Sequence, residues 1–226
     1  MARENTAPVS SPATARAAGD DMQKNKELLG QLERVIATCH NCRLWRGATH
    51  AVPGEGNASA KVMFVGEAPG FNEDKLGRPF VGRAGELLDR LLVRNGFKRD
   101  EVFITNVVKH RPPENRGPMK DEVRACLPYL LQQIQIVNPK VLIPLGRYAL
   151  EVFIKDKPIS EIHGQAYKIG SRVIFPLYHP AAALRSAAVA RIFEKDFRDL
   201  PKVIRGELAT RELEVVSRDK NQLKLI

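Results

Sequence analysis

Four short apolar runs divide the middle of the chain, and each is bounded by glycine, proline or polar residues. They occupy residues 62–65, 102–108, 141–145 and 173–177. Short apolar runs with such boundaries are typical of strands that are buried on both faces of a sheet. The pattern therefore predicts four buried strands.

Three other stretches carry leucine, isoleucine and valine at helical spacing, and each predicts a helix with one apolar face. Their apolar members are Leu28, Leu29, Leu32, Val35 and Ile36, then Leu87, Leu88, Leu91 and Leu92, then Val123, Leu127, Leu130, Leu131 and Ile134. Strands that alternate with helices indicate right-handed crossovers and a parallel sheet covered on both faces. The expected fold class is α/β, as a three-layer α/β/α sandwich with a central four-stranded parallel sheet.

The two ends of the chain differ from its middle. Residues 1–21 are rich in Ala, Ser, Thr and Pro without a hydrophobic period, so a disordered N-terminal tail is expected there. Residues 204–226 are charged and are expected to form a loosely attached C-terminal extension. A length of 226 residues suits one domain, which we place at residues 22–203.

Unusual polar residues follow the predicted strands. Residues 67–70 follow the first strand, Asn106 and residues 109–110 end the second, Gly146 follows the third, and His179 follows the fourth. Ligands of open parallel sheets bind beyond the carboxyl ends of the strands. We therefore expect the functional site at this edge of the sheet.

Charge and cysteine content narrow the functional classes. Lys and Arg number 36 against 26 Asp and Glu, which gives a formal net charge of +10 and favours a polyanionic partner. No apolar run is long enough to span a membrane, and the first residues lack the apolar core of a leader, so a cytoplasmic protein is expected. In a reducing compartment the three cysteines are expected to be metal ligands or free thiols.

All three cysteines and one histidine form a C-x-x-C … H … C pattern. Its members are Cys39, Cys42, His110 and Cys126. Cysteine and histidine at such spacings are typical ligands of zinc or of an iron–sulfur cluster. The pattern predicts a metal site that joins distant parts of the chain.

Several motifs occur in a recognisable order: residues 66–70, 77–82 and 105–109, followed by His179-Pro180. Together with the cysteines they resemble the family 4 uracil-DNA glycosylases, the iron–sulfur branch of that superfamily, over residues 27–203. The resemblance implies a DNA-repair enzyme that flips uracil out of DNA and hydrolyses its N-glycosidic bond, leaving an abasic site. The expected protein is a monomer that binds uracil-containing DNA and no membrane.

The resemblance also assigns the uracil pocket. Asn106 stands where the family reads the base edge, and its amide can both donate and accept hydrogen bonds. Phe80 is expected to stack on the base, and His179 to contact a uracil carbonyl that gains negative charge. Ala68 and Gly70 are expected to line the pocket through the Gly-rich turn.

Two carboxylates are candidates for orienting the attacking water. Some related glycosylases carry Asp at the position of Ala68, as the resemblance aligns it. Glu67 ranks first because it lies within the same motif, and Glu73 ranks second. Loop capping or surface charge is the alternative reading of Glu73.

Other residues are expected to contact DNA. Leu184 resembles the apolar wedge that enters DNA beside the flipped nucleotide, and Arg185 after it is a candidate phosphate contact. The beginning of a helix is the alternative reading of Leu184. Arg111 and Arg116 are expected to approach the DNA backbone.

The metal site departs from the family pattern. Family 4 members bind a [4Fe–4S] cluster through four cysteines, and His110 stands in the third position here. The resemblance favours the cluster, with His110 as an imidazole ligand and a structural role; a Cys₃His zinc site is the lesser alternative. A sister group with the same Lys-His step is trapped covalently on DNA, but the Lys-Arg-Arg-Ile-His loop of that group is missing between Arg111 and Cys126. We therefore expect turnover.

Two other functions fit parts of the sequence. A non-catalytic DNA-binding or polymerase-associated module on the same fold is the main alternative, because fold does not fix function. A nucleotide-phosphate hydrolase that uses the Gly-rich turn is disfavoured, because the chain lacks a Gly-Lys-Ser/Thr step there.

Overall fold

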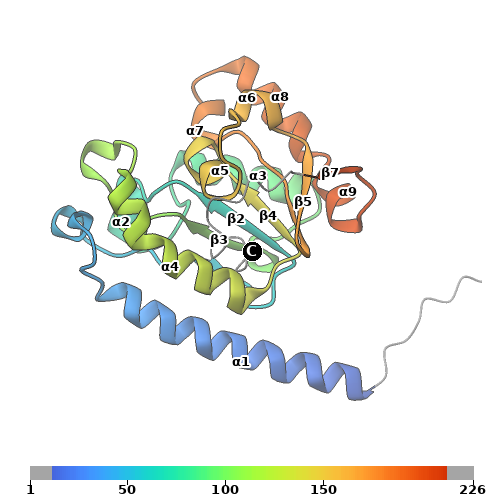
Figure 1. The fold of residues 1–226 in the computed structure, drawn as a ribbon, viewed down its shortest axis with the longest axis horizontal. Helices are drawn as coiled ribbons and strands as arrows, with labels where there is room; N and C mark the ends of the chain where they lie inside the picture. Colours follow the sequence, from blue (N-terminus) through green and yellow to red (C-terminus); the bar gives the residue numbers. More distant parts are fainter. Residues whose placement is uncertain (1–11, 213–226) are drawn as a thin grey trace, which may run out of the picture.

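The computed structural model describes residues 12–212, and its centre is a seven-stranded sheet in the order β1-β3-β2-β4-β6-β5-β7 (Figure 1). The four central strands run parallel: β3 (Phe103–Asn106), β2 (Val62–Gly66), β4 (Val141–Pro144) and β6 (Arg172–Ile174). Each overlaps one of the apolar runs, although β6 ends at Ile174 and Leu177 forms only an isolated bridge with Leu145. The predicted four-stranded parallel sheet is confirmed.

Three short strands that the sequence analysis missed extend the sheet: β1 (Glu55–Gly56), β5 (Ala166–Ile169) and β7 (Thr210–Glu212). β1 pairs antiparallel with β3, β5 pairs antiparallel with β6, and β7 pairs parallel with β5. β7 is exposed throughout, and β1 is only two residues long, so neither has an apolar run to mark it. β7 also shows that part of the predicted C-terminal extension joins the sheet.

Helices cover both faces of the sheet, as predicted. Side chains alternate along β2: Met63 and Val65 face one core, and Val62 and Phe64 face the other. The first core is covered by α1 (Pro12–Ala37), α4 (Lys120–Val137) and α5 (Arg147–Phe153), and the second by α3 (Arg83–Arg94), α8 (Ala187–Phe197) and α9 (Leu200–Arg205). The shorter helical elements are η1 (Arg43–Gly47), α2 (Phe71–Leu76), η2 (Arg99–Glu101), η3 (Pro113–Asn115), α6 (Ile159–Ile162) and α7 (Pro180–Ala183).

Helix α1 begins earlier than the sequence pattern suggests. It starts at Pro12, so residues 12–21 are helical where a disordered tail is expected, and residues 1–11 lie outside the described residues. Alanine, the strongest helix former, is frequent in this stretch. Figure 1 shows α1 alongside α4, and only part of its predicted apolar face is buried: Leu28 and Val35 remain 37% and 54% exposed.

Within residues 12–212, no helix combines the length and the apolar character that crossing a membrane requires. Residues 213–226, the rest of the predicted C-terminal extension, lie outside the described part of the chain.

Candidate active site

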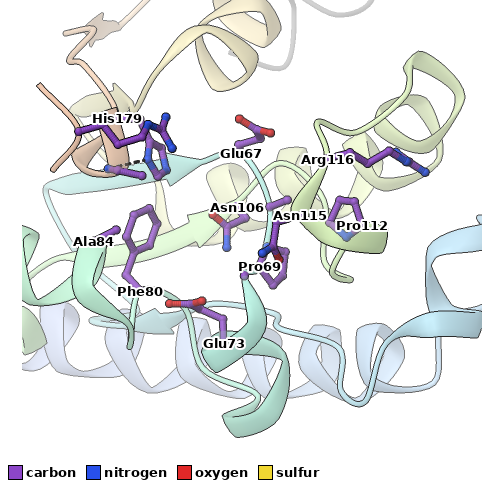
Figure 2. Close-up of a pocket in the computed structure, with 14 residues that line it drawn as sticks. Glu67, Pro69, Glu73, Phe80, Ala84, Asn106, Pro112, Asn115, Arg116 and His179 are labelled. Carbon is purple, nitrogen blue, oxygen red and sulfur yellow. Dashed lines mark hydrogen bonds between the residues drawn. The ribbon is translucent and has the colours of Figure 1, made fainter. Parts of the chain in front are cut away.

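A pocket of about 430 Å³ opens at the carboxyl ends of β2 and β3, at the predicted edge of the sheet (Figure 2). It brings together most of the predicted site residues: Glu67, Ala68, Gly70, Glu73, Phe80, Asn106, Arg116, His179 and Arg185. Pro69, Ala84, Pro112, Asn115 and Ala181 complete the lining and were not predicted. Arg111 and Leu184 are not among the residues that line the pocket.

Asn106 is the last residue of β3, and its side chain points into this pocket. The residue is 1% exposed, and Oδ1 is buried without a hydrogen-bond partner. Gly66 of β2 is paired with Asn106 in the sheet. A Cβ added at Gly66 would lie 2.3 Å from Asn106 Oδ1 and 2.6 Å from the Phe80 ring. A buried acceptor without a partner costs about 1–3 kcal/mol, so this site is built for a donor that arrives with a ligand.

Phe80 forms another wall of the pocket. Its φ of 51° is unusual for a bulky residue, and its ring centre lies 5.7 Å from that of His179. Glycine is required at position 85 because a Cβ there would lie 1.8 Å from the Phe80 carbonyl oxygen. Such backbone strain persists only where surrounding contacts hold it.

Glu73 supplies those contacts. Its Oε1 accepts hydrogen bonds from the backbone N–H groups of Val81 and Gly82, both at 2.9 Å. On the other side, Arg99 Nη2 donates to the carbonyl oxygen of Pro79 at 2.5 Å. This geometry matches the loop-capping alternative for Glu73 better than the orientation of water.

Glu67 has a different environment. It follows β2, is partly buried, and its carboxylate accepts no hydrogen bond from any residue between 12 and 212. Burial raises the pKa of Glu67 to about 7, and the positive charge of Arg147 offsets only part of this shift. In the view of Figure 2, Glu67 and Glu73 lie on opposite sides of Asn106. Glu67 is thus the carboxylate available to a water molecule.

His179 lies at the start of α7. Its Nδ1 accepts a hydrogen bond from the Ala181 N–H at 3.1 Å, so the proton of the neutral ring is on Nε2. Desolvation, with a smaller effect of Arg185, lowers the pKa of His179 to about 4. At neutral pH the residue is therefore an uncharged hydrogen-bond donor on the pocket wall.

Lys109 is a buried residue whose importance the sequence analysis missed. Its Nζ donates three hydrogen bonds of 2.7 Å, to Thr105 Oγ1, the Asn106 carbonyl oxygen and Gln133 Oε1. Within residues 12–212 it forms no ion pair with a carboxylate. Lysine is rarely fully buried. Here its hydrogen bonds connect the backbone of Asn106 to Gln133 of α4. A lysine three residues after a strand gives no sequence signal of such burial.

The residues that are predicted to contact DNA have different environments in the structure. Both Nη groups of Arg116 bind the carboxylate of Glu122 at 2.9 and 2.7 Å, and Figure 2 shows the guanidinium directed away from Asn106. Arg111 Nε instead donates to Asn115 Oδ1 at 2.7 Å. The segment after His179 does begin a helix, as the alternative interpretation holds: α7 starts at Pro180, and Leu184 caps its C-terminal end and is 39% exposed.

The three cysteines gather between the end of α1 and α4. The Tyr129 hydroxyl donates to Cys39 Sγ at 3.2 Å, and a hydrogen bond between Cys42 and Cys126 lowers the pKa of Cys42 to about 6. The same bond and burial raise the pKa of Cys126. Cysteine thiolates are the usual ligands of iron–sulfur clusters, so the chemistry of these side chains suits such a group.

The fourth predicted ligand is not assembled with them. His110 is buried, which lowers its pKa, and the charges that act on it are those of Asp74 and His40. In the described part of the chain, no three His, Cys, Asp or Glu side chains are arranged to hold a metal ion. Cys42 and Cys126 are thus in contact, but among the described residues the predicted ligands do not form a metal site.

Comparison with known proteins identifies relatives of this chain. A family profile described as the uracil DNA glycosylase superfamily matches residues 53–200. A type-4 uracil-DNA glycosylase of Sulfurisphaera tokodaii is 47% identical over 76% of this chain and 83% of its own length. Similar proteins of the same name in Saccharolobus solfataricus and Thermotoga maritima are 44% and 41% identical, over 77% and 82% of this chain and 86% and 100% of their own lengths.

Proposed function

This chain belongs to the uracil-DNA glycosylase superfamily and to its type-4 branch, and we propose that its pocket hydrolyses the N-glycosidic bond of uracil flipped out of DNA. The protein is a DNA-repair uracil-DNA glycosylase. The observation that carries the site assignment is the buried, unpartnered Oδ1 of Asn106, which faces a pocket bounded by Phe80 and His179. We expect the protein to act as a cytoplasmic monomer.

Asn106 reads the base in this proposal. Its Oδ1 accepts a hydrogen bond from the uracil ring N–H, and its Nδ2 donates to a carbonyl. Phe80 stacks on the flipped ring, and Ala68 and Gly70 form the adjacent wall. This support is geometric: Oδ1 has no competing partner among residues 12–212, so uracil satisfies a group that otherwise remains unpaired.

His179 stabilises the leaving group. Bond cleavage leaves negative charge on uracil, and the neutral Nε2–H donates to a carbonyl oxygen that gains this charge. Because the pKa of His179 is about 4, the ring is uncharged at neutral pH and acts as a hydrogen-bond donor, not as a general acid. Such pre-positioned donors are worth about 10²–10³ in rate.

Glu67 orients the attacking water, while Glu73 holds the Phe80 loop and is a positioning residue. A carboxylate accepts a proton from water only when it is ionised. The raised pKa of Glu67, about 7, therefore makes activity depend on pH near neutrality.

The expected result is that kcat/KM for uracil release rises about tenfold per pH unit below about pH 7 and levels off above it. The reason is the sign of the titration: falling pH protonates Glu67 and removes the base. Single-turnover uracil release between about pH 5 and 8 measures this profile. Glu67→Gln is the control: it should release uracil slowly, and its rate should not rise with pH below about pH 7. A wild-type rate that does not change with pH would argue against Glu67 as the base.

DNA contact is proposed for Leu184, Arg185 and Arg111. Leu184 is exposed and fills the gap left by the flipped nucleotide, and Arg185 at the pocket rim contacts phosphate. Arg116 is a weaker candidate because Glu122 already neutralises it.

We further propose that Cys39, Cys42 and Cys126 hold a [4Fe–4S] cluster, with His110 as the fourth ligand. These residues would hold the cluster, which would cross-link the segment after α1 to α4, and hydrolysis needs no redox step. The support is the contact between Cys42 and Cys126, the hydrogen bond from Tyr129 to Cys39, and the type-4 relationship. The imidazole is a chemically suitable fourth ligand, because histidine binds iron in other clusters.

Removal of a ligand tests this proposal. Cys39→Ala and His110→Ala are each expected to lower the bound iron and the Tm, because the cross-link is lost, whereas His110→Cys should retain iron. Metal analysis and thermal unfolding of the purified proteins give the readouts. If the wild type contains stoichiometric zinc and no iron, the site is a Cys₃His zinc site and not a cluster. If His110→Ala retains all of its iron, His110 is not a ligand.

The reaction itself is tested with a labelled oligonucleotide that contains one uracil. One half of the sample is heated in alkali to cleave abasic sites, and the other half is run intact on a denaturing protein gel. Cleavage without a shifted protein band is expected for an enzyme that turns over. A shifted band would mean covalent capture, and binding without cleavage would favour the non-catalytic module.

A further inference from the structure

An exposed aromatic ring lies beside the pocket with two cations around it. Phe71 is the first residue of α2 and follows Gly70, which lines the pocket. It is 52% exposed. Arg111 Cζ lies 5.1 Å from the centre of the Phe71 ring, and Lys75 Nζ lies 5.2 Å from it. Both distances are typical of cation–π contacts.

Arg111 is held in place by a second contact. Its Nε donates to Asn115 Oδ1 at 2.7 Å, and Asn115 lines the pocket, as does Pro112 next to Arg111. The ring and the amide together fix the guanidinium at the mouth of the pocket. The planar fork of arginine suits the oxygens of a phosphate.

Neither cation of this group is neutralised within residues 12–212, where Arg111 and Lys75 form no ion pair. The nearby arginines differ, because Arg116 pairs with Glu122 and Arg43 pairs with Asp121. Two like charges that share one ring repel each other, and an anion between them would remove that repulsion. The arrangement is therefore complementary to a negatively charged ligand at the pocket mouth.

We propose that Phe71, Lys75 and Arg111 form a clamp for the DNA backbone phosphate next to the flipped uridine. The clamp rests on the proposed function, in which DNA enters this pocket. Phe71 orients the two cations through its π face, and the cations bind the phosphodiester. This role differs from base stacking, in which the ring would contact a neighbouring base directly.

Binding of a uracil-free single-stranded oligonucleotide at several salt concentrations tests the charges. Arg111→Gln and Lys75→Gln are each expected to reduce the slope of log K against log salt by about 0.7, which corresponds to one phosphate contact. Phe71→Leu, which keeps the bulk but loses the π face, should bind about fivefold more weakly, whereas Phe71→Tyr should bind like the wild type. Leu76→Ala is the matched control, because Leu76 is on the same helix and is 63% exposed.

A methylphosphonate, which lacks the phosphate charge, locates the contact. Placed in turn at each phosphate beside the uridine, it should lower kcat/KM of the wild type at one position and have little further effect on Arg111→Gln there. The clamp would be overturned if the effects of the methylphosphonate and of Arg111→Gln on kcat/KM were fully additive at both phosphates. It would also be overturned if both charge variants kept the wild-type salt slope, or if Phe71→Leu bound DNA as tightly as the wild type. A further variant, Phe71→Ala, tests base stacking. If its DNA binding is weaker than that of the wild type only when the neighbouring nucleotide carries a base, the ring stacks on that base and the clamp is overturned.

Failure of the clamp and failure of the proposed function are distinguishable. The salt-dependence measurements use DNA without uracil, so they require no base release. A wild-type protein that releases no uracil, but loses DNA affinity in the Arg111 and Lys75 variants, would refute the activity and leave the clamp standing.

Discussion

Asn106→Ala is expected to lower kcat/KM for uracil-containing DNA by about a thousandfold while leaving thermal stability nearly unchanged. The activity falls because the pocket loses the groups that read the uracil edge. The stability remains because the Oδ1 of Asn106 has no hydrogen-bond partner within the described residues, so truncation breaks no bond to it.

Single-turnover kinetics and thermal unfolding, performed on the same preparation, measure the two halves of this prediction. Their combination separates a ligand-binding role from a structural one, because a structural asparagine would lose stability when truncated. Uracil release at the wild-type rate would remove the base-reading assignment, and a large loss of Tm would show that Asn106 supports the fold.

Lys109→Met is expected to lower both stability and activity. The substitution leaves acceptors at Asn106 and Gln133 without their donor, and buried groups of this kind cost about 1–3 kcal/mol each. The carbonyl of Asn106 is also no longer held, so the amide that reads uracil loses its fixed position. We expect kcat to fall by about tenfold to a hundredfold, since small misplacements at a reacting centre have effects of that size.

A second variant separates positioning from folding. In Lys109→Met combined with Gln133→Leu, the Gln133 acceptor is removed together with its donor, which should restore part of the stability. Activity should stay low because the Asn106 carbonyl is still free. Denaturant unfolding and kcat against KM provide the readouts, and Lys61→Met, at an exposed lysine just before β2, is the control. Recovery of full activity in the double variant would contradict a positioning role.

The sequence predicts those parts of the fold that depend on long apolar runs. β2 and β4 are buried along their whole length, so their residues must be apolar and the strands are visible. β7 is exposed and short, and its place is determined by pairing with β5, a tertiary contact that leaves no local pattern. Similarly, α1 extends back to Pro12 through residues that have helical propensity but no apolar period.

The site divides in a similar way. Asn106 and His179 are predictable because parallel strands bring their carboxyl ends to one edge, and the motif resemblance gives each a role. The function of Glu73 depends on which backbone N–H groups its carboxylate reaches, and the burial of Lys109 depends on the packing of α4. Sequence order does not contain either distance. The position of His110 relative to the thiols is a tertiary property of the same kind.

A crystal structure of the protein with free uracil is the most direct test of the pocket assignment. We predict that uracil stacks on Phe80, that Asn106 Oδ1 accepts a hydrogen bond from a ring N–H, and that His179 Nε2 donates to a carbonyl, each at about 3 Å. Uracil bound elsewhere, or bound here with Asn106 Oδ1 still lacking a partner, would contradict the proposed site.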